Sequence, residues 1–150
     1  ALNTLSLHDA LPICGGDLQR AMFAGSSDEF SAAHADQMRQ LHRAGIRPTD
    51  SILDVGCGYG RLFTLMPSTW LGDYVGIDVS PDLIALARVL YPGRRFEVMS
   101  GDRMPFVDQK FDVAVAVWLR TMLTNNGKLD VWQQIELEMR RVARRVVVVW

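Results

Sequence analysis

The sequence has few of the residues that build metal sites and disulfide frameworks. Its 150 residues include two cysteines and three histidines. Cys14 and Cys57 form no C-x-x-C pair, and His8, His34 and His42 lack the spacing of metal ligands. We therefore expect no metal and no disulfide, and a reducing, cytoplasmic setting fits this composition.

Long apolar runs and an excess of one charge are also lacking. The longest uncharged apolar run, residues 113–119, is much too short to cross a bilayer. The formal net charge of −1 gives no electrostatic footprint of a nucleic-acid-binding domain. We expect neither a membrane span nor a nucleic-acid partner. Four arginines cluster near the C-terminus, where a solvated helix end explains them better than a nucleic-acid patch. They are Arg140, Arg141, Arg144 and Arg145.

A glycine-rich turn is the most informative stretch of the chain. Residues 51–55 form a short apolar run with an acid at Asp54, and Gly56, Gly58 and Gly60 follow. The apolar positions after Gly60 indicate the start of a helix. Glycine permits φ > 0 and lets a ligand approach the backbone closely. The N-terminus of a helix adds unpaired N–H groups. The pattern predicts a nucleotide-binding corner.

A second strand-like segment, residues 73–78, also ends in an acid. Ser80 can cap the next helix, and Pro81 suits its first turn. An acid at this place, Asp78, is positioned to accept hydrogen bonds from both hydroxyls of a ribose. NAD enzymes use the same device, so Asp78 indicates a ribose-containing cofactor without selecting one.

The rest of the chain continues the alternation of strands and helices. Residues 111–117 are rich in β-branched side chains and fit a central parallel strand that is covered on both faces. Apolar periodicity predicts helices at about 28–44 and 131–141. The predicted strands are at about 51–55, 73–78, 95–99, 111–117 and 145–150.

Four segments resemble, in order, the motifs of class I S-adenosylmethionine (SAM)-dependent methyltransferases. They are D-V-G-C-G-Y-G, V-G-I-D-V-S-P, S-G-D-R-M-P-F and K-F-D-V-A-V-A-V-W, within residues 51–119. The resemblance implies a Rossmann-like α/β fold: a doubly wound parallel sheet in the order 3-2-1-4-5, with helices on both faces. It also implies SAM as the cofactor. Because the family's sheet usually has seven strands, we expect strands six and seven to be missing at the C-terminus.

The resemblance assigns roles to individual residues. The glycine loop, oriented by Asp54, would surround the amino-acid end of SAM. Asp78 would hold the ribose, and Asp102 and Arg103 the adenine. Val117, Trp118 and Leu119 would form the wall that faces SAM and substrate, although ordinary core packing explains Trp118 equally well. Cys57 suits packing in the turn better than reactivity. The expected cofactor-binding residues are Asp54, Gly56, Cys57, Gly58, Gly60, Asp78, Val79, Asp102, Arg103, Val117 and Trp118.

The match departs from the family after the fourth strand. Many small-molecule members carry a polar pair there, whereas residues 119–123 offer no obvious general base, which leaves the catalytic residue unassigned. Methyl transfer from a sulfonium relies largely on positioning, so a base is needed only if the acceptor must lose a proton before attack. The acceptor stays open, with a small molecule as one candidate. A non-catalytic SAM-binding domain is an alternative. An NAD-dependent oxidoreductase is another, disfavoured by Arg61 at the place of the third glycine of G-x-G-x-x-G.

The first residues of the chain do not resemble a natural protein sequence. Residues 4–13 resemble a translated sequencing adapter, so we expect residues 1–13 to be non-native and exclude them from fold reasoning. Residues 14–50 would then form a helical lid segment, and residues 51–150 an incomplete methyltransferase core.

Overall fold

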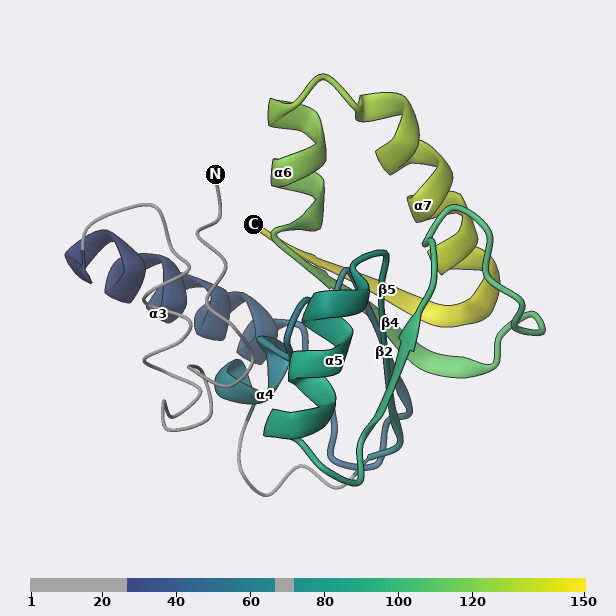
Figure 1. The fold of residues 1–150 in the computed structure, drawn as a ribbon, viewed down its shortest axis with the longest axis horizontal. Helices are drawn as coiled ribbons and strands as arrows, with labels where there is room; N and C mark the ends of the chain where they lie inside the picture. Colours follow the sequence, from purple (N-terminus) through teal and green to yellow (C-terminus); the bar gives the residue numbers. More distant parts are fainter. Residues whose placement is uncertain (1–26, 67–71) are drawn as a thin grey trace.

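The architecture is a parallel sheet flanked by helices, in a computed structural model that describes residues 27–66 and 72–150 (Figure 1). The expected non-native segment 1–13 and the first part of the expected lid lie outside the described residues. The strands are β1 (Ile52–Val55), β2 (Tyr74–Asp78), β3 (Arg95–Val98), β4 (Phe111–Val117) and β5 (Ala143–Val149). The helices are α3 (Ser27–Arg43), α4 (Leu62–Leu65), α5 (Pro81–Leu90), α6 (Leu119–Asn125) and α7 (Leu129–Val142).

The strand order confirms the predicted topology. The described residues form one five-stranded sheet in the order β3-β2-β1-β4-β5, and every neighbouring pair is parallel. The chain moves outward from β1 to β3 on one side and then crosses back to β4 on the other. Ligands of open α/β sheets bind at such a switch point, beyond the carboxyl ends of the strands.

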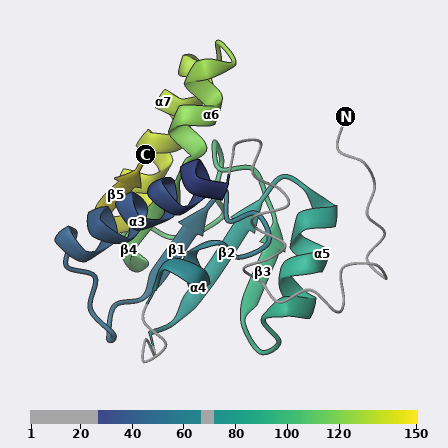
Figure 2. The ribbon, with the colours of Figure 1, turned by 90° about the vertical axis from the view of Figure 1, so that its left-hand side faces the viewer.

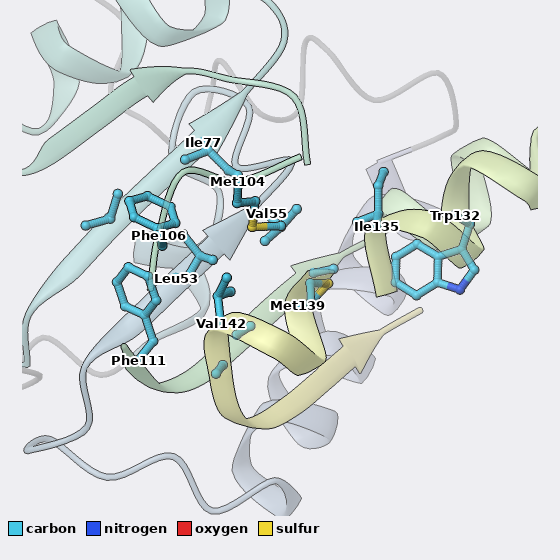
Figure 3. Close-up of a cluster of buried hydrophobic side chains, with 14 residues drawn as sticks. Leu53, Val55, Ile77, Met104, Phe106, Phe111, Trp132, Ile135, Met139 and Val142 are labelled. Atoms are coloured by element: carbon cyan, nitrogen blue, oxygen red, sulfur yellow. The ribbon is translucent and has the colours of Figure 1, made fainter. Parts of the chain in front are cut away.

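Side chains alternate between the two faces of the sheet, as expected for strands buried on both sides. On one face, Ile52 belongs to a buried cluster that includes side chains of α3, α4 and α5. Figure 2 shows how these three helices lie along the sheet. On the other face, Leu53 and Val55 pack against α7 and the residues that precede β4 (Figure 3). The predicted doubly wound fold with helices on both faces is therefore confirmed.

Local signals explain where the helices begin and which face they bury. The hydroxyl of Ser80 accepts a 3.3 Å hydrogen bond from the backbone N–H of Leu83, and Pro81 occupies the first turn, so α5 is capped as predicted. In α7, the buried positions recur at intervals of three and four, which gives the helix one apolar face. These positions are Trp132, Ile135, Met139 and Val142.

Three features differ from the expectation. The helix after the glycine loop, α4, spans only four residues. Helix α6 was not predicted; none of its residues is fully buried, although Leu119 and Leu123 pack at the edge of the core. The solvated helix end proposed for the four arginines is wrong for three of them. Arg144 and Arg145 lie in β5, and half-buried Arg141 bonds to the chain before β4.

Within the described residues, no helix has the length and hydropathy needed to cross a membrane.

Candidate active site

The glycine loop after β1 is held by the neighbouring strand β2. The N–H groups of Gly56 and Cys57 both donate to the carbonyl oxygen of Ile77, at 2.9 and 3.0 Å. Gly56, Gly58 and Gly60 all have positive φ, at 70°, 55° and 96°, and glycine adopts such angles without strain. At Gly58, a Cβ atom would meet nothing within 4 Å. The loop therefore presents open backbone on its outer side.

Asp78, at the end of β2, fastens this loop. One of its carboxylate oxygens accepts a 2.9 Å hydrogen bond from the N–H of Gly58, and the other accepts one of 2.9 Å from the N–H of Ser80. Each oxygen keeps a second lone pair. Asp78 is thus pre-oriented beside the glycine loop with acceptor capacity for two further donors, such as the hydroxyls of a ribose.

Asp54 lies inside the protein, beneath the loop. It is buried, and one of its carboxylate oxygens accepts a 2.7 Å hydrogen bond from the hydroxyl of Tyr74. Burial raises the pKa of Asp54 to about 7, against the opposing effect of the Tyr74 hydrogen bond. Sequence reasoning gave Asp54 a role in orienting the loop but did not identify Tyr74 as its partner.

A cavity of about 220 Å³ opens between the loop, α4 and the end of β4. Asp54, which is negative only when ionised, and the positively charged Arg61 both line it, and the other side chains are mainly apolar. The lining residues are Asp54, Gly56, Cys57, Gly58, Tyr59, Arg61, Leu62, Val117, Trp118 and Met122. The expected cofactor residues of the first and fourth motifs, apart from Gly60, therefore meet at one site.

Trp118 stands at this cavity in an unusual backbone conformation. Its φ of 64° is in the left-handed region, which is rare for a bulky side chain. The N–H of Trp118 donates to the carbonyl of Val149 at 2.8 Å. The guanidinium of Arg61 lies over its ring, 5.3 Å from the centroid. Backbone strain of this kind concentrates at functional sites.

Arg61 is also joined to helix α3 through a buried glutamine. The Nε and Nη2 atoms of Arg61 donate to the Oε1 of Gln37 at 3.0 and 2.6 Å. The Nε2 of Gln37 donates to the carbonyl of Trp150 at 3.3 Å. Gln37 is fully buried and uses both ends of its amide. Sequence reasoning missed this link, because a glutamine on a polar helix resembles a solvated residue.

The residues expected at the adenine lie outside the cavity. Asp102 and Arg103 are exposed on the loop that follows β3, and Val79 is 68% exposed. The hydroxyl of Ser100 donates to Asp102 at 2.6 Å. This loop begins beside Asp78, because the N–H of Met99 donates to the carbonyl of Asp78 at 2.9 Å. The second and third motifs are thus neighbours on the same edge of the sheet.

Cys57 faces the interior. It is buried, and burial together with the charge of Asp54 raises the pKa of its thiol, which fits packing rather than reactivity. The described residues contain no group of three or more His, Cys, Asp or Glu side chains that could hold a metal ion.

Comparison with known proteins agrees with this geometry. The family described as "Methyltransferase domain" matches residues 52–145, which is more than half of the chain. The chain belongs to this family. The match confirms the class of protein predicted from the four motifs, and with it the Rossmann-like fold and SAM as the cofactor of the family.

Individual relatives differ in what their names say they methylate. Over 65 residues the chain is 40% identical to a demethylmenaquinone methyltransferase of Chlorobaculum parvum, covering 43% of this chain and 27% of that protein. Over 106 residues it is 27% identical to a tRNA (carboxymethyluridine(34)-5-O)-methyltransferase of Saccharomyces cerevisiae, covering 69% of this chain and 37% of that protein.

The fold has counterparts among solved structures. A SAM-dependent methyltransferase from Methanosarcina mazei aligns with a TM-score of 0.57 at 27% identity, covering 69% of this chain and 51% of that one. The chain therefore spans between about a quarter and about half of the length of the proteins it matches.

Proposed function

We propose that this domain binds SAM along the carboxyl ends of β1, β2 and β3 and transfers its methyl group to an acceptor beside Trp118. The observation that carries the proposal is the open outer side of the glycine loop. Gly58 has space where a side chain would stand, and the cavity beside it is lined by charges of both signs. Such a site suits the zwitterionic amino-acid end of SAM.

Two charged residues match that zwitterion. Asp54, when ionised, is placed to attract the α-ammonium group, and Arg61 the α-carboxylate. Gly56, Gly58 and Gly60 provide the close backbone approach.

The nucleoside follows the edge of the sheet. Asp78 would accept hydrogen bonds from the ribose hydroxyls with the lone pairs that Gly58 and Ser80 leave available. Exposed Val79 would cover one side of the sugar and base. Asp102 would accept from the exocyclic amino group of adenine, and Arg103 would lie against the ring.

The acceptor would bind between α3, α6 and Trp118. Trp118 and Met122 provide apolar walls, and Arg61 provides a positive charge at the same cavity. This combination favours a small planar acceptor that carries negative charge, such as a phenolate or enolate, over a cationic one such as lysine. Helix α3, tied to the loop through Gln37, would act as the lid of the site.

Bound SAM supplies an electrophilic methyl group on a sulfonium. The electron pair of the acceptor forms the new bond to the methyl carbon while the carbon–sulfur bond breaks and its electrons remain on sulfur. An acceptor that is already anionic has no proton to lose. The absence of an obvious base in residues 119–123 is then compatible with catalysis, and Val117 and Trp118 would hold the reactants in line.

Binding is tested by thermal melts of the 150-residue chain alone, with S-adenosylhomocysteine and with NAD. A ligand that binds only the folded state raises the melting temperature. We expect a rise with S-adenosylhomocysteine and none with NAD. A rise with NAD alone would overturn the assignment to SAM.

Transfer is tested with radiolabelled SAM and three acceptors: a dihydroxynaphthoate, a lysine peptide and an unmodified tRNA. We expect label on the naphthoate alone. Label on the peptide or the tRNA would refute the small anionic acceptor, and binding of SAM without any transfer would favour the non-catalytic alternative.

A further inference from the structure

One arginine of α7 holds the loop that carries Asp102. Nη1 of Arg141 donates to the carbonyl of Phe106 at 2.8 Å, and Nη2 donates to the carbonyl of Met104 at 2.7 Å. Nη1 also contacts the carboxylate of Asp108 at 2.9 Å. A single planar guanidinium therefore fixes two backbone carbonyls of the segment that follows Asp102, which a lysine cannot do with the same geometry.

Glu138, one helical turn earlier, pairs with Arg141. These two side chains form a bracket that holds the backbone of Met104 and Phe106. The Oε2 of Glu138 accepts from the backbone N–H of Met104 at 2.8 Å and from Nη2 of Arg141 at 2.8 Å, and its Oε1 accepts from Nε of Arg141 at 2.8 Å. Both backbone polar groups of Met104 are thus bound by this pair. The hydrogen bonds from Arg141 and Met104 lower the pKa of Glu138 to about 2, so the pair is ionised at neutral pH.

The loop is fixed on both sides of Asp102. On the near side, Met99 bonds to Asp78, and the space at Gly101 is closed, because a Cβ there would lie 3.0 Å from Val55. On the far side, the Met104 side chain is buried in the core and its backbone is held by the bracket. Asp102 and Arg103 project between these anchors.

We infer that Glu138 and Arg141 are positioning residues that set the base specificity of the nucleoside site by holding Asp102 where it meets the exocyclic amino group of adenine. This inference rests on the proposed function. A carboxylate acceptor in a fixed position accepts from the 6-amino group of adenine and repels the 6-oxo group of hypoxanthine. A site built for one hydrogen-bonding pattern discriminates strongly against a ligand that lacks it. Discrimination declines if the acceptor can move away.

A purely structural role for the bracket makes a different prediction. If Glu138 and Arg141 only stabilise the fold, their loss lowers the melting temperature and weakens all nucleoside ligands by the same factor. If they position Asp102, their loss weakens the adenine ligand more than the hypoxanthine ligand. The ratio of the two affinities therefore separates the explanations in any variant that still folds.

The test uses the 150-residue chain and calorimetry with S-adenosylhomocysteine and S-inosylhomocysteine. The unmodified chain should prefer the adenine ligand by about tenfold or more, the magnitude of one charged hydrogen bond. Arg141→Lys keeps the positive charge but removes the planar guanidinium that donates to several acceptors at once. It should reduce this preference at least about threefold. Arg140→Lys is the matched control, because Arg140 is exposed and pairs only with Glu136 among the contacts described; it should leave the preference unchanged.

Glu138→Gln provides a second variant of nearly the same shape. Its amide nitrogen faces groups that donate, so it should reduce the preference in the same direction as Arg141→Lys. An unchanged preference in both variants would overturn the inference while leaving the proposed function intact. Loss of cooperative melting in both would also overturn it, in favour of a structural role. If the unmodified chain binds neither ligand, the proposed function itself fails.

Discussion

The hydroxyl of Tyr74 donates a 2.7 Å hydrogen bond to the carboxylate of Asp54 inside the protein. Gly76 makes this contact possible. It lies opposite Asp54 in the register of β1 and β2, and a Cβ at Gly76 would stand 2.7 Å from the Tyr74 hydroxyl. The lack of a side chain at Gly76 therefore leaves room for the Tyr74 hydroxyl to reach Asp54. Tyr74 and Asp54 lie directly beneath the glycine loop.

Ligand affinity should depend on pH because Asp54 titrates near neutrality. Burial raises its pKa to about 7, the Tyr74 hydrogen bond opposes that rise, and the charge of Asp78 adds to it. In the proposed binding mode ionised Asp54 would attract the ammonium of the ligand, so the affinity for S-adenosylhomocysteine should increase about tenfold as pH rises from about 5.5 to 8. Calorimetry across this range measures it. In Asp54→Asn the affinity should not change with pH. If the affinity of that variant still rises with pH as in the unmodified chain, another group is responsible.

Asp54→Asn should also stabilise the protein at alkaline pH. The pKa of Asp54 is raised from 3.8 in the unfolded chain to about 7 in the folded one, so folding is penalised wherever the unfolded carboxyl is ionised. The penalty is absent below the unfolded pKa, grows between about pH 4 and 7, and is complete above that. Calorimetric melts should show a gain of at least about 4 °C at pH 8 that shrinks toward zero near pH 4.5. A gain independent of pH would contradict this account.

Two alanine substitutions in the glycine loop should separate binding from stability. At Gly60, a Cβ would lie 2.6 Å from the Tyr91 ring at a φ of 96°, so Gly60→Ala should lower the melting temperature. At Gly58, the Cβ position is empty, so Gly58→Ala carries only the cost of its positive φ, about 1 kcal/mol. Its methyl group would occupy the proposed path of the ligand. Gly58→Ala should therefore weaken the binding of S-adenosylhomocysteine more than tenfold and lower the melting temperature less than Gly60→Ala does. A larger loss of stability in Gly58→Ala, with a smaller loss of binding, would contradict this account.

The fold was predictable from sequence because its signals are local. β1, β2 and β4 are short, mainly apolar runs that turn residues separate from the next helix or strand, and Ser80 and Pro81 mark the start of α5. The resemblance to known motifs then supplied the strand order. Helix α6 escaped prediction because it begins at the left-handed backbone of Trp118, which is stabilised by a hydrogen bond to Val149 in another strand.

Only those residues of the candidate site that belong to the sequence motifs were predictable. Asp54, Gly56, Gly58, Val117 and Trp118 were named and do meet at one cavity, whereas Gly60, Asp78, Asp102 and Arg103 were named and do not line it. The partners that hold them were not named, because they come from distant segments. Gln37 reaches Arg61 across 24 positions, and Arg141 reaches Met104 across 37. Such pairs follow from tertiary packing and have no local pattern in the chain.

Replacement of Asp78 should damage binding through two routes. Asp78→Ala removes the proposed ribose acceptor and also releases the N–H groups of Gly58 and Ser80. We expect at least tenfold weaker binding of SAM, since the loss of one charged hydrogen bond has about that effect. Calorimetry measures affinity, and a melt without ligand measures the structural part. Unchanged affinity would exclude the ribose assignment.

Gln37 should couple helix α3, the proposed lid, to the cavity. Gln37→Leu has a similar volume but removes the acceptor of two N–H groups of Arg61 and the donor to Trp150. Because Gln37 is buried and Arg61 is partly buried, the variant should lose about 1–3 kcal/mol of stability. Arg61 would also no longer be held over Trp118, so the affinity for S-adenosylhomocysteine should fall. Met38→Leu, at an exposed neighbouring position, is the control and should change neither quantity.

Gln37→Glu separates the two hydrogen bonds of this residue. A glutamate keeps an acceptor for Arg61 but loses the donor to Trp150. If the lid acts through Arg61, the glutamate variant should bind the ligand nearly as well as the unmodified chain, although it melts at a lower temperature. If affinity instead follows melting temperature across Gln, Glu and Leu, the helix contributes stability alone and does not shape the site.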